Sequence, residues 1–394
     1  MIQRALKVRI YPNKRQQVLI EKTFGCCRFI YNQMLNERIE VYQRRKNDEN
    51  KRNLYEWKYK TEKEYKEEYN WLKEVDATAL QQSRKDLIST YNRFFTSLKS
   101  KNDFVGFPKF KKKTYNNSFT SSQAYSINVN FHESKISLPK LKDIKYRHGG
   151  IKQWYKEPTS RLINITISKS CSGKYYASCL FSGDEDFTGI KKPINKTKGL
   201  DCSLSKFYVD EQGKSPDYVK NYKQLESKLA KAQKNLSRKS RGSNNFEKAR
   251  IKVAKIQEHI ANKRLDFVNK LSTTLIREND CIVVENLNLK EMAQSKLKLG
   301  KSVYDLGYSM FVNKLIYKAK WQDKTVVIAD RWFASSKICH VCGYVNKDLT
   351  LNQRKWECPC CGTYHDRDQN AAVNLYNLVN SSTAANVESY ACEE

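Results

Sequence analysis

The chain has 394 residues, enough for two or three domains, and carries 73 Lys and Arg against 42 Asp and Glu, a net charge of +31. A merely soluble surface does not need such an excess, which predicts a polyanionic partner, and nucleic acid fits best. No apolar run approaches the roughly 18 residues that span a bilayer. The N-terminus also lacks a signal-peptide pattern. We therefore expect an intracellular protein with no membrane partner, in which Cys residues serve as metal ligands or core residues rather than disulfides.

The first third of the chain predicts one strand followed by helices. Apolar and polar residues alternate over 4–11, which indicates a strand, and Pro12-Asn13 ends it and starts a helix. A highly charged helical pattern then continues to Lys99. We expect an all-α lobe over 12–103, with the strand in 1–11 free to join a later sheet.

A β module is expected over 104–197. The patterns predict strands at 126–131, 135–138 and 162–168, and Ser172-Gly173 is typical of a hairpin turn into a strand at 174–181. The module begins with the run "VGFPKFKKK". We interpret its cations as a phosphate-contacting loop rather than a solvated one; they are Lys109, Lys111, Lys112 and Lys113.

The remaining chain alternates strands with helices. We predict a hairpin over 199–210 with a turn near 212–213, helices over 217–236 and 246–277, strands at 281–285 and 325–329, and helices over 310–321 and 367–379. The break between the two long helices carries Arg238, Lys239 and Arg241, which are expected to be exposed and able to touch nucleic acid. The polar tail, 382–394, is expected to be disordered.

Two pairs of cysteines form the strongest single motif. Cys339-x2-Cys342 and Cys358-x2-Cys361, with 15 residues between the pairs, match the spacing of a zinc ribbon. Four thiolates on two tight turns close a tetrahedral structural site for Zn²⁺. Cys360 fits this spacing less well, a redox role is the weaker alternative, and His340 and His365 are expected to be neighbours rather than ligands.

Three acids are attached to apolar strands or to a helix start. Asp201 lies on a predicted strand, Glu285 ends the strand "CIVVE", and Asp368 starts the last helix. An acid in a basic protein is usually a solvated surface group, but three in one domain would repel one another unless a cation lay between them. Mg²⁺ takes carboxylate oxygens and a substrate phosphate, and two such ions about 4 Å apart serve phosphodiester hydrolysis.

The order of strands and helices is that of an RNase H-like fold, and the acid order Asp, Glu, Asp distinguishes its RuvC-type branch from transposases ordered Asp, Asp, Glu. Matching segments are spread over nearly the whole chain. They are "VRIYPNKRQ", "FGCCRFIYNQML", "VGFPKFKKK", "GLDCSLSKFYVD", "NKRLDFVNKLSTTLI", "VVENLNL", "SSKICHVCG" and "CPCCGTYHDRDQNAA". In these segments the chain resembles the TnpB family, transposon-encoded relatives of type V CRISPR effector nucleases.

The resemblance implies a multidomain α/β and α+β protein. Residues 12–103 would be a helical recognition lobe, and 1–11 with 104–197 a β-barrel-like wedge module. Residues 198–337 and 363–381 would form the RuvC-like nuclease domain, with 338–362 inserted as a zinc-binding module that holds target strand against the last carboxylate.

The resemblance also implies an activity. Family members use a guide RNA from the transposon end to cut double-stranded DNA beside a short motif, in a prokaryotic cytoplasm. Asp201, Glu285 and Asp368 correspond by position to the catalytic acids, although Asp366 lies in the same run. Two departures are Ser203, where the family commonly has Gly, and the extra thiol of Cys360.

Two other functions fit the same architecture. An RNA-guided regulator that no longer cuts would be expected to lose at least one acid, whereas all three are present. An unguided RuvC-like nuclease or transposase would have little use for a large basic helical lobe and wedge.

Overall fold

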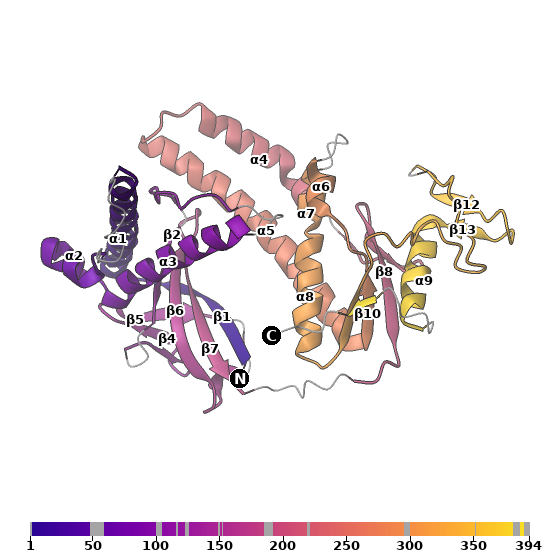
Figure 1. The fold of residues 1–394 in the computed structure, drawn as a ribbon, viewed down its shortest axis with the longest axis horizontal. Helices are drawn as coiled ribbons and strands as arrows, with labels where there is room; N and C mark the ends of the chain where they lie inside the picture. The colour runs from indigo at the N-terminus through magenta and orange to yellow at the C-terminus, as the bar shows by residue number, and fades with distance from the viewer. Residues whose placement is uncertain are drawn as a thin grey trace. The chain divides into compact units, whose positions relative to one another are not determined.

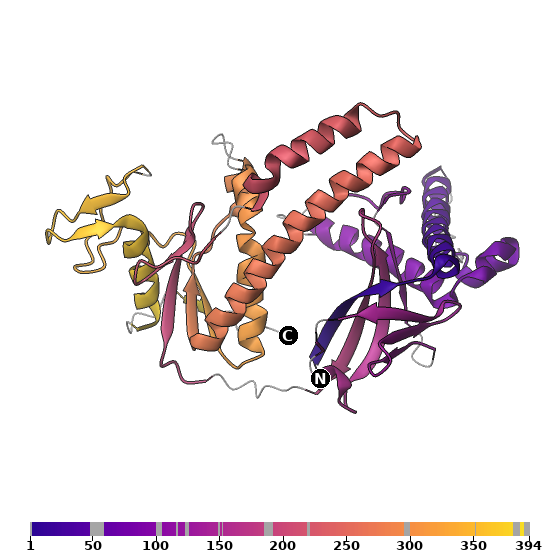
Figure 2. The ribbon, with the colours of Figure 1, turned by 180° about the vertical axis from the view of Figure 1, so that it is seen from behind.

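The computed structural model describes residues 2–47, 59–99, 105–115, 117–122, 126–148, 150–151, 153–184, 192–218, 221–294, 300–350, 352–380 and 387–389. Contacts divide the chain into two compact units, Met1–Glu185 and Asp186–Glu394. Figure 1 labels most of the elements of both units, and Figure 2 shows them from behind. Within the described ranges, none of the helices combines the length and the apolar character that crossing a bilayer requires.

The first unit is built on a seven-stranded half-barrel sheet. Its strands are β1 Ile2–Tyr11, β2 Asn117–Ser121, β3 Asn128–Asn130, β4 Lys135–Leu138, β5 Lys142–Arg147, β6 Arg161–Lys169 and β7 Tyr175–Gly183, in the order β2-β6-β7-β1-β5-β4-β3. Strand β1 pairs antiparallel with β7 and β5. The prediction that the first strand joins the sheet across the intervening helices is therefore confirmed. Strands β2 and β5 were not predicted, because they contain only one and two apolar residues, too few to establish a period.

Helices cover this sheet. They are α1 Lys14–Asn47, α2 Glu62–Glu68 and α3 Ala77–Lys99, with the short 3-10 helices η2 Asn70–Glu74 and η3 Gln153–Lys156. The predicted helical stretch is thus divided, and residues 48–58 lie outside the described residues. Helix α1 joins the sheet's apolar core where Phe24 meets Phe119 edge to face, with ring centroids 5.7 Å apart.

The second unit contains a five-stranded sheet whose three central strands are parallel and whose two outer strands are antiparallel to their neighbours. Its strands are β8 Thr197–Ser203, β9 Phe207–Asp210, β10 Cys281–Val284, β11 Thr325–Ala329 and β14 Val387–Ser389, in the order β14-β11-β10-β8-β9. Strand β10 pairs parallel with both β8 and β11. All four of its residues are buried, as expected for a parallel strand that is covered on both faces.

Helices lie on both faces of this second sheet (Figure 1). Helix α9 Arg367–Asn380 packs on β8, β9 and β10, whereas α5 Asn244–Glu278 and α8 Tyr308–Lys320 cover the opposite face. Helix α4 Asn221–Ser237 pairs with the first half of α5 to form a long hairpin. The short helices α6 Leu289–Gln294 and α7 Gly300–Leu306 precede α8.

Three expectations for this unit need correction. The β8–β9 hairpin turns at residues 204–206, because Ser203 pairs with Phe207, and the turn at Gln212-Gly213 comes only after β9. Residues Asp217 and Tyr218 precede helix α4 rather than belonging to it. The tail is not without structure at Val387–Ser389, where β14 pairs with the open edge of β11.

A small knuckle connects β11 to α9. Strands β12 Lys355–Glu357 and β13 Tyr364–Asp366 pair antiparallel, and an isolated bridge joins Ile338 to Val345. The knuckle has a core of its own, formed by Cys339, Leu349, Trp356 and Cys358.

Candidate active site and metal centre

The sheet register brings two of the predicted acids to the same level. Strand β10 runs parallel to β8 with Val284 opposite Leu200, so the next residues, Glu285 and Asp201, are level with one another. The third acid, Asp368, lies in the first turn of α9, which packs directly on β8. The three acids are 84 and 83 positions apart in the sequence (285 − 201 and 368 − 285). The fold brings their segments together where β8 and β10 end and α9 begins.

The electrostatics of Asp201 indicate that Glu285 and Asp368 lie near it. Asp201 is only 8% exposed. Burial raises its pKa well above the ordinary value, and the charges of Glu285 and Asp368 raise it further. Burial also raises the pKa of Glu285, although a hydrogen bond from the Ser335 hydroxyl opposes that rise. Burial and the nearby charges of Glu285 and Asp368 thus disfavour the charged form of Asp201, and a cation bound beside it would relieve that cost.

A glycine allows α9 to approach the strand that carries Asp201. A Cβ atom on Gly199 would lie 2.2 Å from the carbonyl oxygen of Ala372 and 2.6 Å from the backbone nitrogen of Tyr376. No real side chain tolerates such distances, so only glycine fits between β8 and α9 here. The position of Asp368, one turn earlier on the same helix, depends on this close contact.

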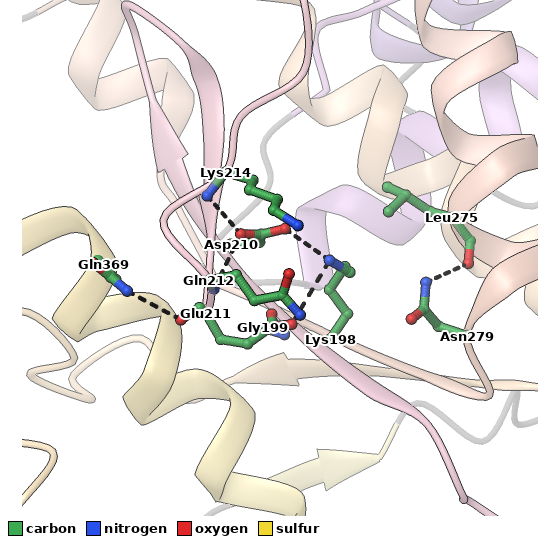
Figure 3. Close-up of polar contacts among 9 residues, drawn as sticks. All are labelled: Lys198, Gly199, Asp210, Glu211, Gln212, Lys214, Leu275, Asn279 and Gln369. Carbon is green, nitrogen blue, oxygen red and sulfur yellow. Dashed lines mark hydrogen bonds and ion pairs between the residues drawn. The ribbon is translucent and has the colours of Figure 1, made fainter.

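Polar contacts fix the first turn of α9 to the end of β9 (Figure 3). The side chain of Gln369 donates a hydrogen bond to the carbonyl of Glu211 at 3.4 Å. The largely buried Asp210 accepts hydrogen bonds from Lys198 Nζ at 2.7 Å and from the backbone nitrogen of Lys214 at 2.7 Å. The residue next to Asp368 is therefore tied to an ordered hairpin.

The structure separates the two acids of the run "HDRD". The Oδ1 atom of Asp366 accepts hydrogen bonds from the backbone nitrogens of Asp368 and Gln369, both at 3.1 Å. This is the geometry of a helix cap. The charge of Asp368, in contrast, raises the pKa of Asp201. Asp368 Oδ1 also accepts a hydrogen bond from Arg354 at 3.2 Å.

Two further residues at this edge were not predicted. The buried Ser335 donates its hydroxyl hydrogen to Glu285 Oε1 at 2.8 Å. Arg367 lies close enough for its charge to lower the pKa of both Asp201 and Glu285. A lone serine gives no sequence signal, whereas Arg367 could have been suspected because it lies between two acids.

The four predicted cysteines are brought together. Their sulfur atoms all lie within 4.8 Å of one another, with Cys339 and Cys361 at 3.7 Å and Cys342 and Cys358 at 3.6 Å. A tetrahedral Zn²⁺ site with bonds of about 2.3 Å needs sulfurs about 3.8 Å apart. Cys360 is exposed and lies outside this cluster.

His365 supports the cysteine cluster without belonging to it. Its buried Nε2 lies 3.1 Å from Cys339 Sγ, and its ring packs on Trp356 with centroids 4.6 Å apart. On the other side, a hydrogen bond with Thr363 lowers the pKa of the Cys361 thiol to about 6. His365 and Thr363 are therefore placed to orient the thiolates that would bind a metal ion.

Two buried asparagines join the knuckle to α9. Asn370 Oδ1 accepts a hydrogen bond from the backbone nitrogen of His340 at 3.1 Å, while its Nδ2 donates to the carbonyl of Ile338 at 2.7 Å. Asn374, one turn later, donates to the carbonyls of Ser335 and Ile338 at 2.8 and 2.7 Å. Their spacing of four residues on an amphipathic helix is a signal that sequence reasoning could have used.

The predicted nucleic-acid contacts lie in two separate units. In the first, Lys109, Lys112 and Lys113 are exposed, but Lys111 is engaged by Asp86 at 3.8 Å and by the ring of Tyr31. In the second, Arg238, Lys239 and Arg241 are exposed between α4 and α5.

A basic groove continues along the α4–α5 hairpin from that connection. Among the described residues, its lining includes no carboxylate and no Phe, Tyr or Trp. Six lysines line it: Lys228, Lys231, Lys239, Lys248, Lys252 and Lys255. We call this surface the hairpin groove.

The fold is that of a multidomain α/β protein with a half-barrel sheet in one unit and a four-cysteine knuckle in the other. Family models match residues 1–47 ("Helix-turn-helix domain" of OrfB_IS605), 188–296 ("Probable transposase") and 308–375 ("Cas12f1-like, TNB domain"). A "Putative RNA-guided DNA endonuclease" of Streptomyces pristinaespiralis is 33% identical over 379 residues, 95% of this chain and 89% of that protein. The chain belongs to this family, the TnpB family of transposon-encoded proteins.

Two further comparisons agree. The "Putative RNA-guided DNA endonuclease InsQ" of Escherichia coli K12 is 29% identical over 389 residues, 94% of this chain and 91% of that protein. Among solved structures, Cas12f1 in a complex with sgRNA and target DNA matches with a TM-score of 0.53, covering 95% of this chain and 99% of that one. At 13% sequence identity this match shows a shared fold.

Proposed function

We propose that this chain is an RNA-guided DNA endonuclease of a transposon. It would cut double-stranded DNA beside a short motif by metal-dependent hydrolysis, in a prokaryotic cytoplasm. The observation that supports the proposal is that Glu285 follows β10 level with Asp201 on the neighbouring parallel strand, and that the charges of Glu285 and Asp368 both raise the pKa of Asp201. The activity named for the relatives, at 33% and 29% identity over nearly the whole chain, supports the same conclusion.

The acid cluster fits Mg²⁺. Asp201, Glu285 and Asp368 supply only carboxylate oxygens, which Mg²⁺ prefers, and their mutual repulsion is relieved by a cation. Bound divalent cations would supply positive charge that activates the attacking water and stabilises the leaving oxygen. Within the chain, Ser335 orients Glu285, and the contact at Gly199 sets the position of Asp368. We propose that the three acids are RuvC-type catalytic residues and that Asp366 serves as the helix cap.

We assign Zn²⁺ to the four cysteines. The spacing of their sulfurs matches a tetrahedral site, and the asparagine contacts fix this module to the helix that carries Asp368. A structural metal there would hold the knuckle folded, so that it could guide target strand to the acids.

The remaining surfaces would bind the nucleic acids. The helical lobe and half-barrel would serve as recognition lobe and wedge, with Lys109, Lys112 and Lys113 on phosphates. Arg238, Lys239 and Arg241 would continue the hairpin groove. A guide RNA from the transposon end and double-stranded target DNA are the proposed partners.

The first test is to express the protein with its flanking DNA, purify it and sequence the RNA that stays bound. A single discrete RNA with a short exchangeable segment is expected, and the complex should cut matching DNA only with Mg²⁺. Random or absent RNA would instead favour an unguided nuclease.

The second test separates cutting from binding. Asp201→Ala, Glu285→Ala and Asp368→Ala should each abolish cleavage yet leave RNA-directed DNA binding intact, as measured by gel shift. Loss of binding in all three would overturn the assignment of the metal site, and binding without cleavage in the unmodified protein would favour a regulator.

A further inference from the structure

One aromatic side chain lies fully in solvent beside the acid cluster. Trp332 is 84% exposed, more than any other large hydrophobic residue in the part of the chain that the structure describes. Burying an indole is strongly favourable, so a tryptophan left in water is unusual and marks a contact site. The residues around Trp332 indicate what it contacts.

The loop that carries Trp332 follows the strand next to Glu285. Strand β11 runs parallel to β10 with Ile328 opposite Val284, so Ala329 is level with Glu285. Trp332 comes three residues after Ala329 and three residues before Ser335, whose hydroxyl binds Glu285. Three residues of chain span at most about 10 Å. Trp332 is therefore attached to the same edge of the sheet as the acids.

Hydrogen bonds and packing order this loop. The Asp330 side chain accepts a hydrogen bond from the backbone nitrogen of Trp332 at 2.7 Å, and the Asp330 carbonyl accepts one from the nitrogen of Phe333 at 3.1 Å. Phe333 packs against the core that contains Ala329 and Leu375. Trp332 thus lies in an ordered turn: Phe333 on one side is packed in the core, and Asp330 on the other side holds the Trp332 backbone nitrogen.

A cation accompanies the indole. The guanidinium of Arg331 lies 5.7 Å from the centroid of the Trp332 ring and forms an ion pair with Glu291 at 2.9 Å. Such an arrangement supports one face of the ring and places positive charge beside it. Aromatic rings of this kind in basic proteins stack on nucleobases.

We propose that Trp332 is a stacking platform for an unpaired nucleobase of the DNA strand that is cut at the acid cluster. A base inside a duplex has both faces covered by its neighbours, so only an unpaired base can stack on the indole. The strand that reaches the acids must pass this edge of the sheet, within a few nucleotides of Trp332. The inference deepens the proposed function and rests on it for the identity of the strand.

The experiment compares three variants of the RNA-bound complex. Trp332→Ala removes the ring, Trp332→Phe keeps an aromatic face, and Tyr304→Ala removes another exposed aromatic side chain, 67% exposed, on α7 of the same unit. Thermal unfolding should be unchanged in all three. We expect Trp332→Ala to slow single-turnover cleavage roughly 5- to 150-fold, Trp332→Phe to retain most of the rate, and Tyr304→Ala to match the unmodified protein.

An abasic scan of the cleaved strand identifies the stacked base. With the unmodified protein, one abasic position near the scissile bond should slow cleavage by a similar factor. With Trp332→Ala the same position should have no further effect, because the contact is already lost. Unchanged cleavage by Trp332→Ala, or additive losses at every position, would overturn the inference.

Fluorescence separates this inference from the proposed function. 2-Aminopurine at that position of the DNA strand should be quenched by the unmodified protein and not by Trp332→Ala, whereas 2-aminopurine in the guide RNA should show no such difference. If the complex cuts no DNA, the proposed function fails, and quenching of a single-stranded DNA probe still decides whether Trp332 stacks. Absence of quenching with the unmodified protein would refute the platform, and a difference confined to the RNA would reassign the base.

Discussion

Two aspartates separated by a single residue have different roles in the run "HDRD". Asp366 is exposed and accepts the backbone hydrogen bonds of the first turn of α9. Asp368 is less exposed, and its charge acts on the buried Asp201. The sequence placed the catalytic role on Asp368, although Asp366 lies in the same run and could share it.

This difference predicts opposite phenotypes. Asp368→Asn should reduce cleavage to the background level without changing the free energy of unfolding appreciably. Asp366→Ala should keep cleavage but lower the free energy of unfolding by about 1 kcal/mol, since a helix cap is lost. Cleavage assays combined with urea unfolding measure both effects. Retained cleavage in Asp368→Asn together with loss in Asp366→Ala would reverse the assignment.

At the scale of elements, the contact between β8 and α9 determines whether the site is assembled. Gly199 has no side chain, and the backbone of α9 occupies the space where one would be. The helix is thereby held against the strand that carries Asp201, with Asp368 one turn away from the contact. This arrangement makes a residue without any functional group necessary for the geometry of the acids.

Gly199→Ala should therefore damage the site. Overpacking of this kind costs about 1–3 kcal/mol, and displacement of α9 should lower cleavage far more than guide RNA binding. Gly25→Ala is the matched control, because Gly25 lies within a helix and its Cβ would meet no atom within 4 Å. That variant should be neutral or slightly more stable. Thermal unfolding and single-turnover cleavage compare the two, and equal behaviour would contradict the argument.

The knuckle provides a second matched pair. Cys358 belongs to the four-cysteine cluster, whereas the exposed Cys360 does not. Cys358→Ser should lose the bound Zn²⁺ and make the knuckle sensitive to proteolysis, while Cys360→Ser should keep one metal ion per chain. Metal analysis by mass spectrometry and limited proteolysis give the readout. A Cys358→Ser protein that is folded, zinc-free and active would show that the metal is dispensable.

Much of the site could be predicted from local sequence. The apolar strands "CIVV" and "TVVIA", the last helix and the Cys spacing give strong periodic or spacing signals, and the structure confirms the strands, the helix and the cysteine cluster. Ser335, Arg367 and the asparagine pair were missed because their importance comes from contacts between distant segments. Strands β2 and β5 were missed because they carry only one and two apolar residues, too few to establish a period, and cross-strand pairing completes them.

At the scale of the whole molecule, the net charge of +31 includes one surface where several lysines lie together. The hairpin groove brings six lysines together with no acid and no Phe, Tyr or Trp in its lining. Stacking on single-stranded bases needs aromatic rings, so the groove suits the phosphates of a double-helical segment.

Salt dependence tests the groove. Replacing Lys228, Lys248 and Lys252 together by Ala should weaken nucleic-acid binding and lower the slope of log K against log salt concentration by about 2 to 3, because up to three phosphate contacts are lost. Lys270→Ala is the control, since Lys270 is paired with Asp266 at 2.8 Å outside the groove. Binding titrations at several salt concentrations measure the slopes. An unchanged slope would place the phosphates elsewhere.

The three acids span most of the second unit, and this has a consequence for the protein while it is being made. Asp201 leaves the ribosome 167 residues before Asp368 (368 − 201). At about 5–20 residues per second that interval lasts roughly 8 to 33 seconds. Within this time the nascent chain completes its hairpin groove and can hold nucleic acid, but it has no complete set of carboxylates. A product truncated before α9 would therefore bind without cutting, and the host's DNA would be exposed to cleavage only by finished chains.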